Sequence, residues 1–171
     1  MSKIKNFFVI CLVGFVALFS ATASAASLSD YLENKLIDAF LRGQAYTMPP
    51  TTYVALATTA GSDAACGTEV TGGSYARAPV TSSLANWAGT QGAGTTVAST
   101  GTGGTTSNNN AVTFPAAPTA NWGQVVEFCV FDAASSGNLL FRAALTTPKT
   151  INNGDAAPSF AAGALTFQID N

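Results

Sequence analysis

The chain has no histidine among its 171 residues. This absence excludes Ser-His-Asp and Cys-His catalysis and every metal site with histidine ligands. Calcium sites need closely spaced oxygen ligands, and the sequence has no Asp-x-Asp-x-Asp-Gly run. The glycine-rich stretches do not reproduce the patterns that cradle phosphate between a strand and a helix. The sequence therefore predicts no metal ion and no cofactor.

Charged residues are also scarce, at 9% of the chain. The few basic residues are dispersed, so nothing in the sequence would drive binding to a phosphate backbone, and we expect no nucleic-acid partner. Solubility must come from hydroxyl and amide groups, because Ala, Thr, Gly, Ser and Asn are abundant. Such surfaces are typical of packed assemblies and of the outside of cells. An ordinary small-residue β-protein with no assembly role fits the same composition.

The N-terminal segment 1–25 has the three regions of an export signal. Lys3 and Lys5 precede an apolar run over residues 7–19, and Ala-Ser-Ala at 23–25 offers a cleavage site. The alternative is a retained membrane anchor, but the run is shorter than the ~20 residues that a spanning helix needs. We expect cleavage after Ala25, a secreted or cell-surface location, and no stable membrane span afterwards. Residues 26–171 suit a single domain.

Two cysteines, Cys66 and Cys129, remain after such a cleavage. Two thiols in an exported chain predict one disulfide. The alternative is that both are unpaired, with Cys129 a small core residue in the apolar stretch 125–131.

One amphipathic helix is expected over residues 28–42. Its apolar positions recur at a spacing of three and four and are Leu28, Leu32, Leu36, Ile37, Phe40 and Leu41. Ser27 with Asp30 resembles a capping box, and Gly43 is placed to end the helix in a left-handed conformation. The apolar stripe either covers the domain's own core or packs against a neighbouring subunit.

After Pro49 and Pro50 the pattern changes to the alternation of β-strands. We expect about seven short strands, at 52–58, 74–81, 111–114, 123–132, 139–145, 150–151 and 164–169. Turn-forming residues separate them, which favours a mainly β fold, an antiparallel β-sandwich or jelly-roll. Residues 89–110 hold only Val97 as a large apolar residue and predict a flexible polar loop, which either joins strands or takes part in recognition.

Candidates for chemistry are few. Paired carboxylates could hydrolyse a glycoside, and the candidates are Glu69, Glu127 and Asp132. Glu127 could be an acid in a cleft, but an outward-facing strand residue is the favoured interpretation, and we expect no enzyme. Trp87 and Trp122 are candidates for stacking on sugar rings or for the core.

Three ordered strings carry a resemblance to a known family. They are GTEVTGGSYAR (67–77), FDAASSGNLLFRAAL (131–145) and KTINNGDAAPSFAAGALTF (149–167). With the helix and the strands around them, they make residues 27–170 similar to small phage tail-fibre and virion structural proteins. The resemblance implies a non-catalytic, β-rich particle component that oligomerises or displays loops, and it offers no catalytic residues.

Two features depart from that family pattern. Members usually begin near the equivalent of Ser27, without an export signal, and have small residues such as glycine at the positions of Cys66 and Cys129. These departures favour a second location, an exported surface or filament subunit. The expected function is therefore that of a self-associating structural protein, with copies of itself or with other virion or surface proteins as partners. The alternative is a secreted, adhesin-like module that binds cell-surface glycans.

Overall fold

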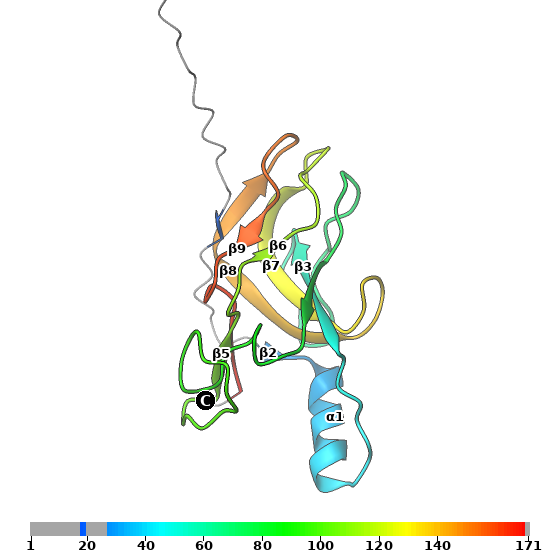
Figure 1. Ribbon diagram of the computed structural model, residues 1–171. Coiled ribbons are helices and arrows are strands. Elements are labelled where there is room, and N and C mark those ends of the chain that lie inside the picture. Colours follow the sequence, from blue (N-terminus) through cyan, green and yellow to red (C-terminus); the bar gives the residue numbers. More distant parts are fainter. Residues whose placement is uncertain (1–17, 20–26, 170–171) are drawn as a thin grey trace, which may run out of the picture.

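The computed structural model describes residues 18–19 and 27–169 (Figure 1). The expected export signal, 1–25, lies outside the described residues apart from the short strand β1 (Leu18–Phe19). Within the described residues, no helix combines the length and the apolar character that a membrane span requires.

The largest sheet has five strands in the order β2-β8-β7-β3-β4. Its bounds are β2 (Ser27–Leu28), β8 (Leu139–Ile151), β7 (Gly123–Phe131), β3 (Thr51–Ala57) and β4 (Ala78–Thr81). All four pairs of neighbours are antiparallel. β7 lies at the centre because its residues 127–131 are buried on both faces of the sheet, and the long strand β8 pairs with it.

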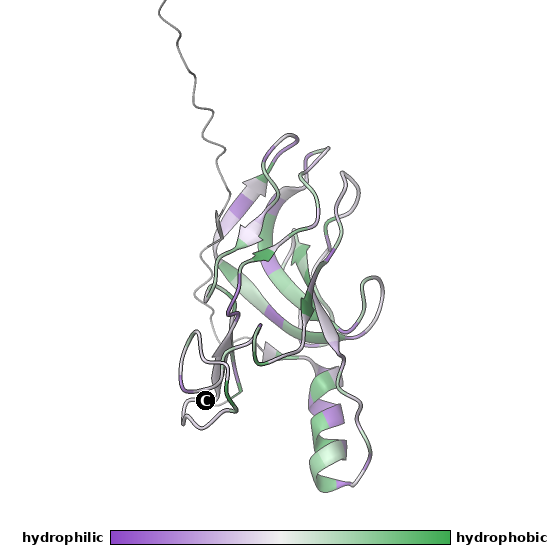
Figure 2. Cartoon of the chain, in the orientation of Figure 1, coloured by the Kyte–Doolittle hydropathy of each residue, from purple (hydrophilic) through white to green (hydrophobic). Residues whose placement is uncertain are grey.

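Two smaller sheets cover one face of the large sheet. One has the order β1-β9-β6, with β6 (Val112–Thr113) and β9 (Ser159–Phe160), and the other pairs β10 (Thr166–Gln168) with β5 (Thr105–Ser107). Phe128 of the large sheet meets Phe160 and Phe167 of the small sheets, with ring centroids 5.6 and 5.8 Å apart. Figure 2 shows apolar residues along the strands that face this core. The prediction of a mainly β, antiparallel fold is confirmed.

The second face of the large sheet has its own small cluster. Ala55, Cys129, Phe131 and Leu139 are buried there, and Cys66 packs against them. Cys66 belongs to residues 58–69, which follow β3, fold back over the sheet and return through a bridge between Glu69 and Ala57. The side chains of this cluster are therefore covered by chain rather than open to solvent.

The helix α1 (Asp30–Leu41) begins two residues later than the sequence predicts. Its N-cap is Ser29, whose hydroxyl accepts a hydrogen bond from the Leu32 amide and donates to the Leu139 carbonyl. The expected capping box at Ser27 is wrong, because Ser27 and Leu28 pair with β8 instead. Gly43 follows the helix with a φ of 67°, as expected. The helix projects from one end of the strand layers, and the next residues run back beside it (Figure 1).

Three other sequence expectations need correction. The loop expected over 89–110 contains β5, and Asn108 within it is buried, donating to the Asn110 and Ala161 carbonyls and accepting from the Leu165 amide. The strands expected at 139–145 and 150–151 are one strand, β8. The strand β9 was not anticipated, since two residues between turns show no alternation.

Candidate functional site

The six apolar positions of the predicted stripe divide into two groups in the structure. Leu32 is buried, and Leu28 and Leu36 are partly buried against the main core. The other three, Ile37, Phe40 and Leu41, are 50%, 77% and 82% exposed. They are spaced three and four residues apart, so they form a second apolar face near the end of α1. We call Ile37, Phe40 and Leu41 the helix tip.

An apolar groove lies at the base of the same helix. It consists of two adjoining cavities of about 200 and 360 Å³, which share Thr52, Phe141 and Ile169 as lining residues. Trp87 and Phe167 line the smaller cavity. The larger cavity reaches between the body and α1, where its lining includes Leu28, Leu32, Leu36, Met48 and Leu140.

Exposed large apolar residues concentrate at these two places. Among the described residues they are Ile37, Phe40, Leu41, Met48, Leu84, Val97 and Ile169. Three form the helix tip, and Met48 and Ile169 line the groove. Of these seven described residues, only Leu84 and Val97 lie outside both the helix tip and the groove. Such a concentration is typical of a contact surface, whereas single scattered apolar residues are ordinary.

The two tryptophans, predicted as candidate ligand contacts, lie in different environments. Trp122 is 4% exposed, packs edge-on against Tyr75, and donates its indole N–H to the Gly73 carbonyl. Trp87 is partly exposed and packs edge-on against Phe167. Trp122 therefore belongs to the core, and Trp87 is the one of the two that a ligand could reach.

The predicted polar loop is held to the domain by amide side chains. Asn109 accepts a hydrogen bond from the Gly94 amide and donates to the Thr95 and Leu84 carbonyls. Residues 90–103 are nevertheless almost all exposed. The structure brings together no cluster of aromatic side chains on this loop among the described residues.

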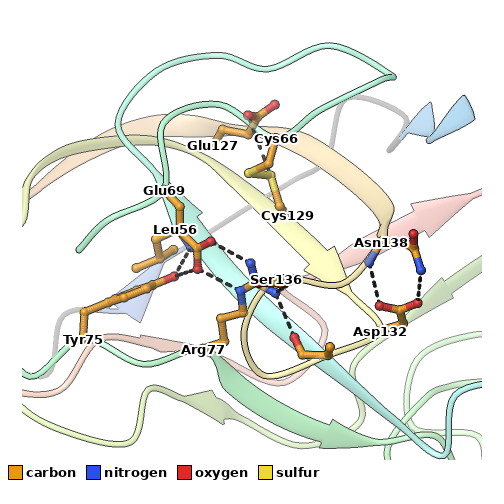
Figure 3. A network of polar contacts seen from close by, with 11 residues as sticks. Leu56, Cys66, Glu69, Tyr75, Arg77, Glu127, Cys129, Asp132, Ser136 and Asn138 are labelled. Atoms are coloured by element: carbon orange, nitrogen blue, oxygen red, sulfur yellow. Dashed lines mark hydrogen bonds and ion pairs between the residues drawn. A yellow bond between two sulfur atoms is a disulfide. The ribbon is translucent and has the colours of Figure 1, made fainter. Parts of the chain in front are cut away.

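The two cysteines form the predicted disulfide, Cys66 to Cys129, with the two Cα atoms 6.1 Å apart. It joins residues 58–69 to the middle of β7, on the second face of the large sheet. Figure 3 shows Glu127 beside this bridge, and its carboxylate lies 3.8 Å from the Cys129 sulfur.

Glu127 is 1% exposed, so the expectation of an outward-facing residue is wrong. It does point away from the main core, as strand alternation requires, but residues 58–69 cover it. Its Oε1 accepts a hydrogen bond from Arg142 Nε at 2.7 Å, and its Oε2 accepts from the amides of Gly61 and Gly67 at 2.8 and 3.1 Å. A side chain at residue 67 would overlap the Thr59 carbonyl oxygen, so this close approach requires glycine.

These contacts also bear on metal binding. Cys66, Glu127 and Cys129 place one potential ligand atom each within 4.8 Å of one another. The two sulfurs are bonded to each other, and the carboxylate is already paired with a guanidinium and two amides. Metal binding would have to break the disulfide and the ion pair, so the arrangement fits a structural clamp.

The other candidate carboxylates are engaged as well. Glu69 forms two hydrogen bonds with Arg77, of 2.9 and 2.8 Å, and Arg77 donates to the Ala133 and Ser136 carbonyls and lies 3.6 Å over the Phe131 ring. Asp132 accepts from the backbone and side-chain amides of Asn138, both at 2.7 Å (Figure 3). Glu69, Glu127 and Asp132 thus stabilise turns and covering segments.

Tyr75 joins this network through its hydroxyl. It accepts a hydrogen bond from the Leu56 amide and donates one to Glu69, each 3.0 Å long. Burial raises the pKa of Tyr75 above its ordinary value of 10.0, and the nearby carboxylate of Glu69 acts in the same direction.

We therefore expect stability to fall as the pH rises above 10, the ordinary pKa of the tyrosine. The unfolded tyrosine ionises there while the folded one keeps its proton, so the contribution of the raised pKa is present below pH 10 and is lost above it. Urea unfolding at several alkaline pH values would measure this. Tyr75→Phe is the matched variant, and its stability should decline less steeply. If the free energy of unfolding fell equally steeply with pH in both proteins, Tyr75 would not be the source of the pH dependence.

The groove was not found from the sequence. Its residues come from α1, from six strands (β2, β3, β5, β7, β8 and β10) and from segments between and after the strands, and each alone is an ordinary core or edge residue. Alternation with Leu165 and Phe167 predicts that Ile169 is buried, but it is 67% exposed. A partial signal was present in Met48, a large apolar residue beside two prolines that end regular structure.

The comparison with protein families gives a direct result. The family described as podophage GP4 fiber I protein gp80 matches residues 27–168, which is most of the chain. No curated protein matches the chain. The matched region includes α1, all lining residues of the groove except Ile169, the Arg77–Glu69 and Arg142–Glu127 pairs, and the disulfide. The chain therefore belongs to the podophage GP4 fiber I protein gp80 family, a family of phage fibre proteins that are structural components of the virion.

Proposed function

We propose that this protein is a non-enzymatic fibre subunit that works by associating with copies of itself through the helix tip. The observation that supports this most is the exposure of Ile37, Phe40 and Leu41, at 50% or more for each, at the end of a projecting helix. A chain that acted alone in water would gain from polar residues at these positions. Membership of a fibre family supports the same role.

The energy available from the tip sets a limit on how it can act. Complete burial of a Leu, Ile or Phe side chain contributes about 1.5–3 kcal/mol. Association opposes this with about 4–15 kcal/mol of lost translational and rotational freedom. Three side chains buried against a flat surface therefore give weak association at best. The tip needs a receiving surface that is itself apolar and concave.

We expect the double variant Phe40→Ser/Leu41→Ser to shift the protein from an oligomer to a monomer, weakening association at least 100-fold. These two side chains are the most exposed of the tip, and removing them should leave the fold intact. Sedimentation velocity would measure the mass. Leu84→Ser/Val97→Ser is the matched control, because those residues are 54% and 61% exposed but lie elsewhere.

A wild-type protein that is monomeric at all accessible concentrations would contradict self-association. If such a monomer were retained on a glycan array, the adhesin-like alternative would be favoured. The observation on the side of that alternative is Trp87, which stays partly exposed beside the polar loop.

We further propose that the protein folds in an oxidising compartment after export. The support is the Cys66–Cys129 bridge, since disulfides form and persist outside the reducing cytoplasm. Export with cleavage and synthesis without export predict different N-termini. N-terminal sequencing of the purified protein should find Ala26 first if the leader is removed, and Met1 or Ser2 if it is not.

A further inference from the structure

We infer that the apolar groove of one copy receives the helix tip of another copy. This inference rests on the proposed self-association and adds the surface that the tip meets. It assigns a function to the two cavities that share Thr52, Phe141 and Ile169.

The groove cannot be filled by the tip of its own chain. The first half of α1 lines the groove through Leu32 and Leu36, whereas Leu41 ends the helix five residues after Leu36. At 1.5 Å per residue, the end of the helix lies about 7.5 Å further along the axis than Leu36. Figure 1 shows the helix pointing away from the sheets. The tip is therefore available only to another molecule.

The chemistry of the groove selects an apolar occupant. Neither cavity is lined by a charged residue. Three of the four lining hydroxyls are already bonded to the protein's own backbone: Thr52 donates to the Val80 carbonyl, Ser82 to Pro49 and Thr106 to Ala88. The fourth is that of Tyr46. A sugar or an ion would lose most of its hydrogen bonds to water there, with few polar groups to replace them. Phe40 and Leu41 of a second copy would lose none.

The rim of the groove is also apolar, like the helix tip. Met48 and Ile169 are 60% and 67% exposed, so the rim itself has apolar surface left to bury. Docking would cover five of the seven exposed large apolar residues in the described chain at one contact. This accounts for their uneven distribution, which a tip-to-tip contact would account for only in part.

Tip and groove are different surfaces, so each copy can give one and receive the other. Contacts of this type build either closed rings, including two-fold pairs, or open filaments. Each of these assemblies suits a fibre component, and each is built from one type of contact, a helix tip in a groove.

The test uses two variants that each lack one side of the contact. Phe40→Ser/Leu41→Ser removes the tip and keeps the groove, and Met48→Glu/Ile169→Glu places charge on the rim and keeps the tip. Each alone should be monomeric. Mixed in equal amounts, they should form a 1:1 pair and nothing larger, because one intact tip meets one intact groove and the remaining surfaces are disabled. Circular dichroism would check that both variants keep the wild-type spectrum and unfold in one cooperative transition.

The outcomes separate this inference from the proposed function. If Met48→Glu/Ile169→Glu keeps the wild-type mass, or if the mixture stays monomeric, the groove is not the receiving surface, while self-association through the tip still stands. If the wild-type protein is monomeric, both proposals fail.

A second measurement locates the contact directly. Photo-reactive benzoylphenylalanine in place of Phe40 should cross-link to peptides that contain residues 48–52, 139–142 or 165–169 of another copy. Cross-links to residues 37–42, which include the helix tip and none of the groove lining, would show tip-to-tip packing and overturn the inference. The same probe in place of Leu84 is the control, and it should give neither product.

Discussion

Replacing Arg142 by methionine should lower the free energy of unfolding by about 3–5 kcal/mol, the usual effect of removing one partner of a buried ion pair. Glu127 would be left 1% exposed, with two backbone amides but without its guanidinium. Arg142 also donates to the Gly61 carbonyl at 3.0 Å, so residues 58–69 would lose a second anchor. Urea denaturation followed by tryptophan fluorescence would measure the change.

A matched control comes from the exposed pair on the helix. Arg42 contacts Asp38 at 2.8 Å, but its side chain is 70% exposed. Arg42→Met should therefore change stability by about 1 kcal/mol or less. In a Glu127→Gln background the Arg142→Met change should have a smaller effect, because no buried charge is left unpaired. Equal effects for Arg142→Met and Arg42→Met would show that burial of the pair is unimportant.

Loss of the disulfide should have a comparable effect. The bridge closes a loop with a sequence separation of 63, and the chain-entropy relation assigns such a loop about 4 kcal/mol. Cys66→Ala is the best single variant, because Cys66 is only partly buried and Cys129, which is fully buried, stays in place. Thermal unfolding of the wild-type and variant proteins would measure the difference.

Reductant provides the control for that experiment. Reductant should lower the melting temperature of the wild-type protein to about that of Cys66→Ala. It should leave the melting temperature of Cys66→Ala unchanged. Thiol labelling of the unfolded, unreduced wild-type protein should find neither Cys66 nor Cys129 free. Labels on both residues would refute the bridge, as would a wild-type protein indifferent to reductant.

The strands were largely predictable because alternation is a local pattern. The strand expected at 52–58 is β3 at Thr51–Ala57, and the one expected at 123–132 is β7 at Gly123–Phe131. Pro148 made β8 look like two strands. The strand passes through it because the register with β7 shifts between Val125 and Glu127, so Pro148 lies in an irregular stretch where its missing N–H does no harm.

The expectation that Glu127 faces outward failed for a non-local reason. Alternation correctly placed its side chain on the face opposite Phe128, but it could not show that residues 58–69 return to cover that face. The residues that indicate the burial of Glu127 are far apart in the sequence. They are Arg142, opposite Cys129 on the neighbouring strand, and the glycines at 61 and 67. Each of these residues has an ordinary explanation by itself.

The helix was the clearest local prediction, but the sequence did not show which part of its apolar stripe stays exposed. A stripe of six apolar residues gives no indication of which ones the protein covers by itself. The division between Leu36 and Ile37 depends on the length of the return segment after Gly43, which brings Tyr46 and Met48 back beside only the base of the helix. The groove depends on the same return, and so neither surface could be derived before the chain was folded.

The position of α1 also separates the molecule into two ends. The turn at 152–155 lies at the end opposite the helix, next to the segment that holds Pro118 and Asn121 (Figure 1). Gly154 donates its amide to Pro118 and has open space around its Cα. Peptides inserted there would face away from any contact made by the helix. If subunits associate through the helix tip as proposed, peptides of varied sequence inserted at this turn should leave that association unchanged.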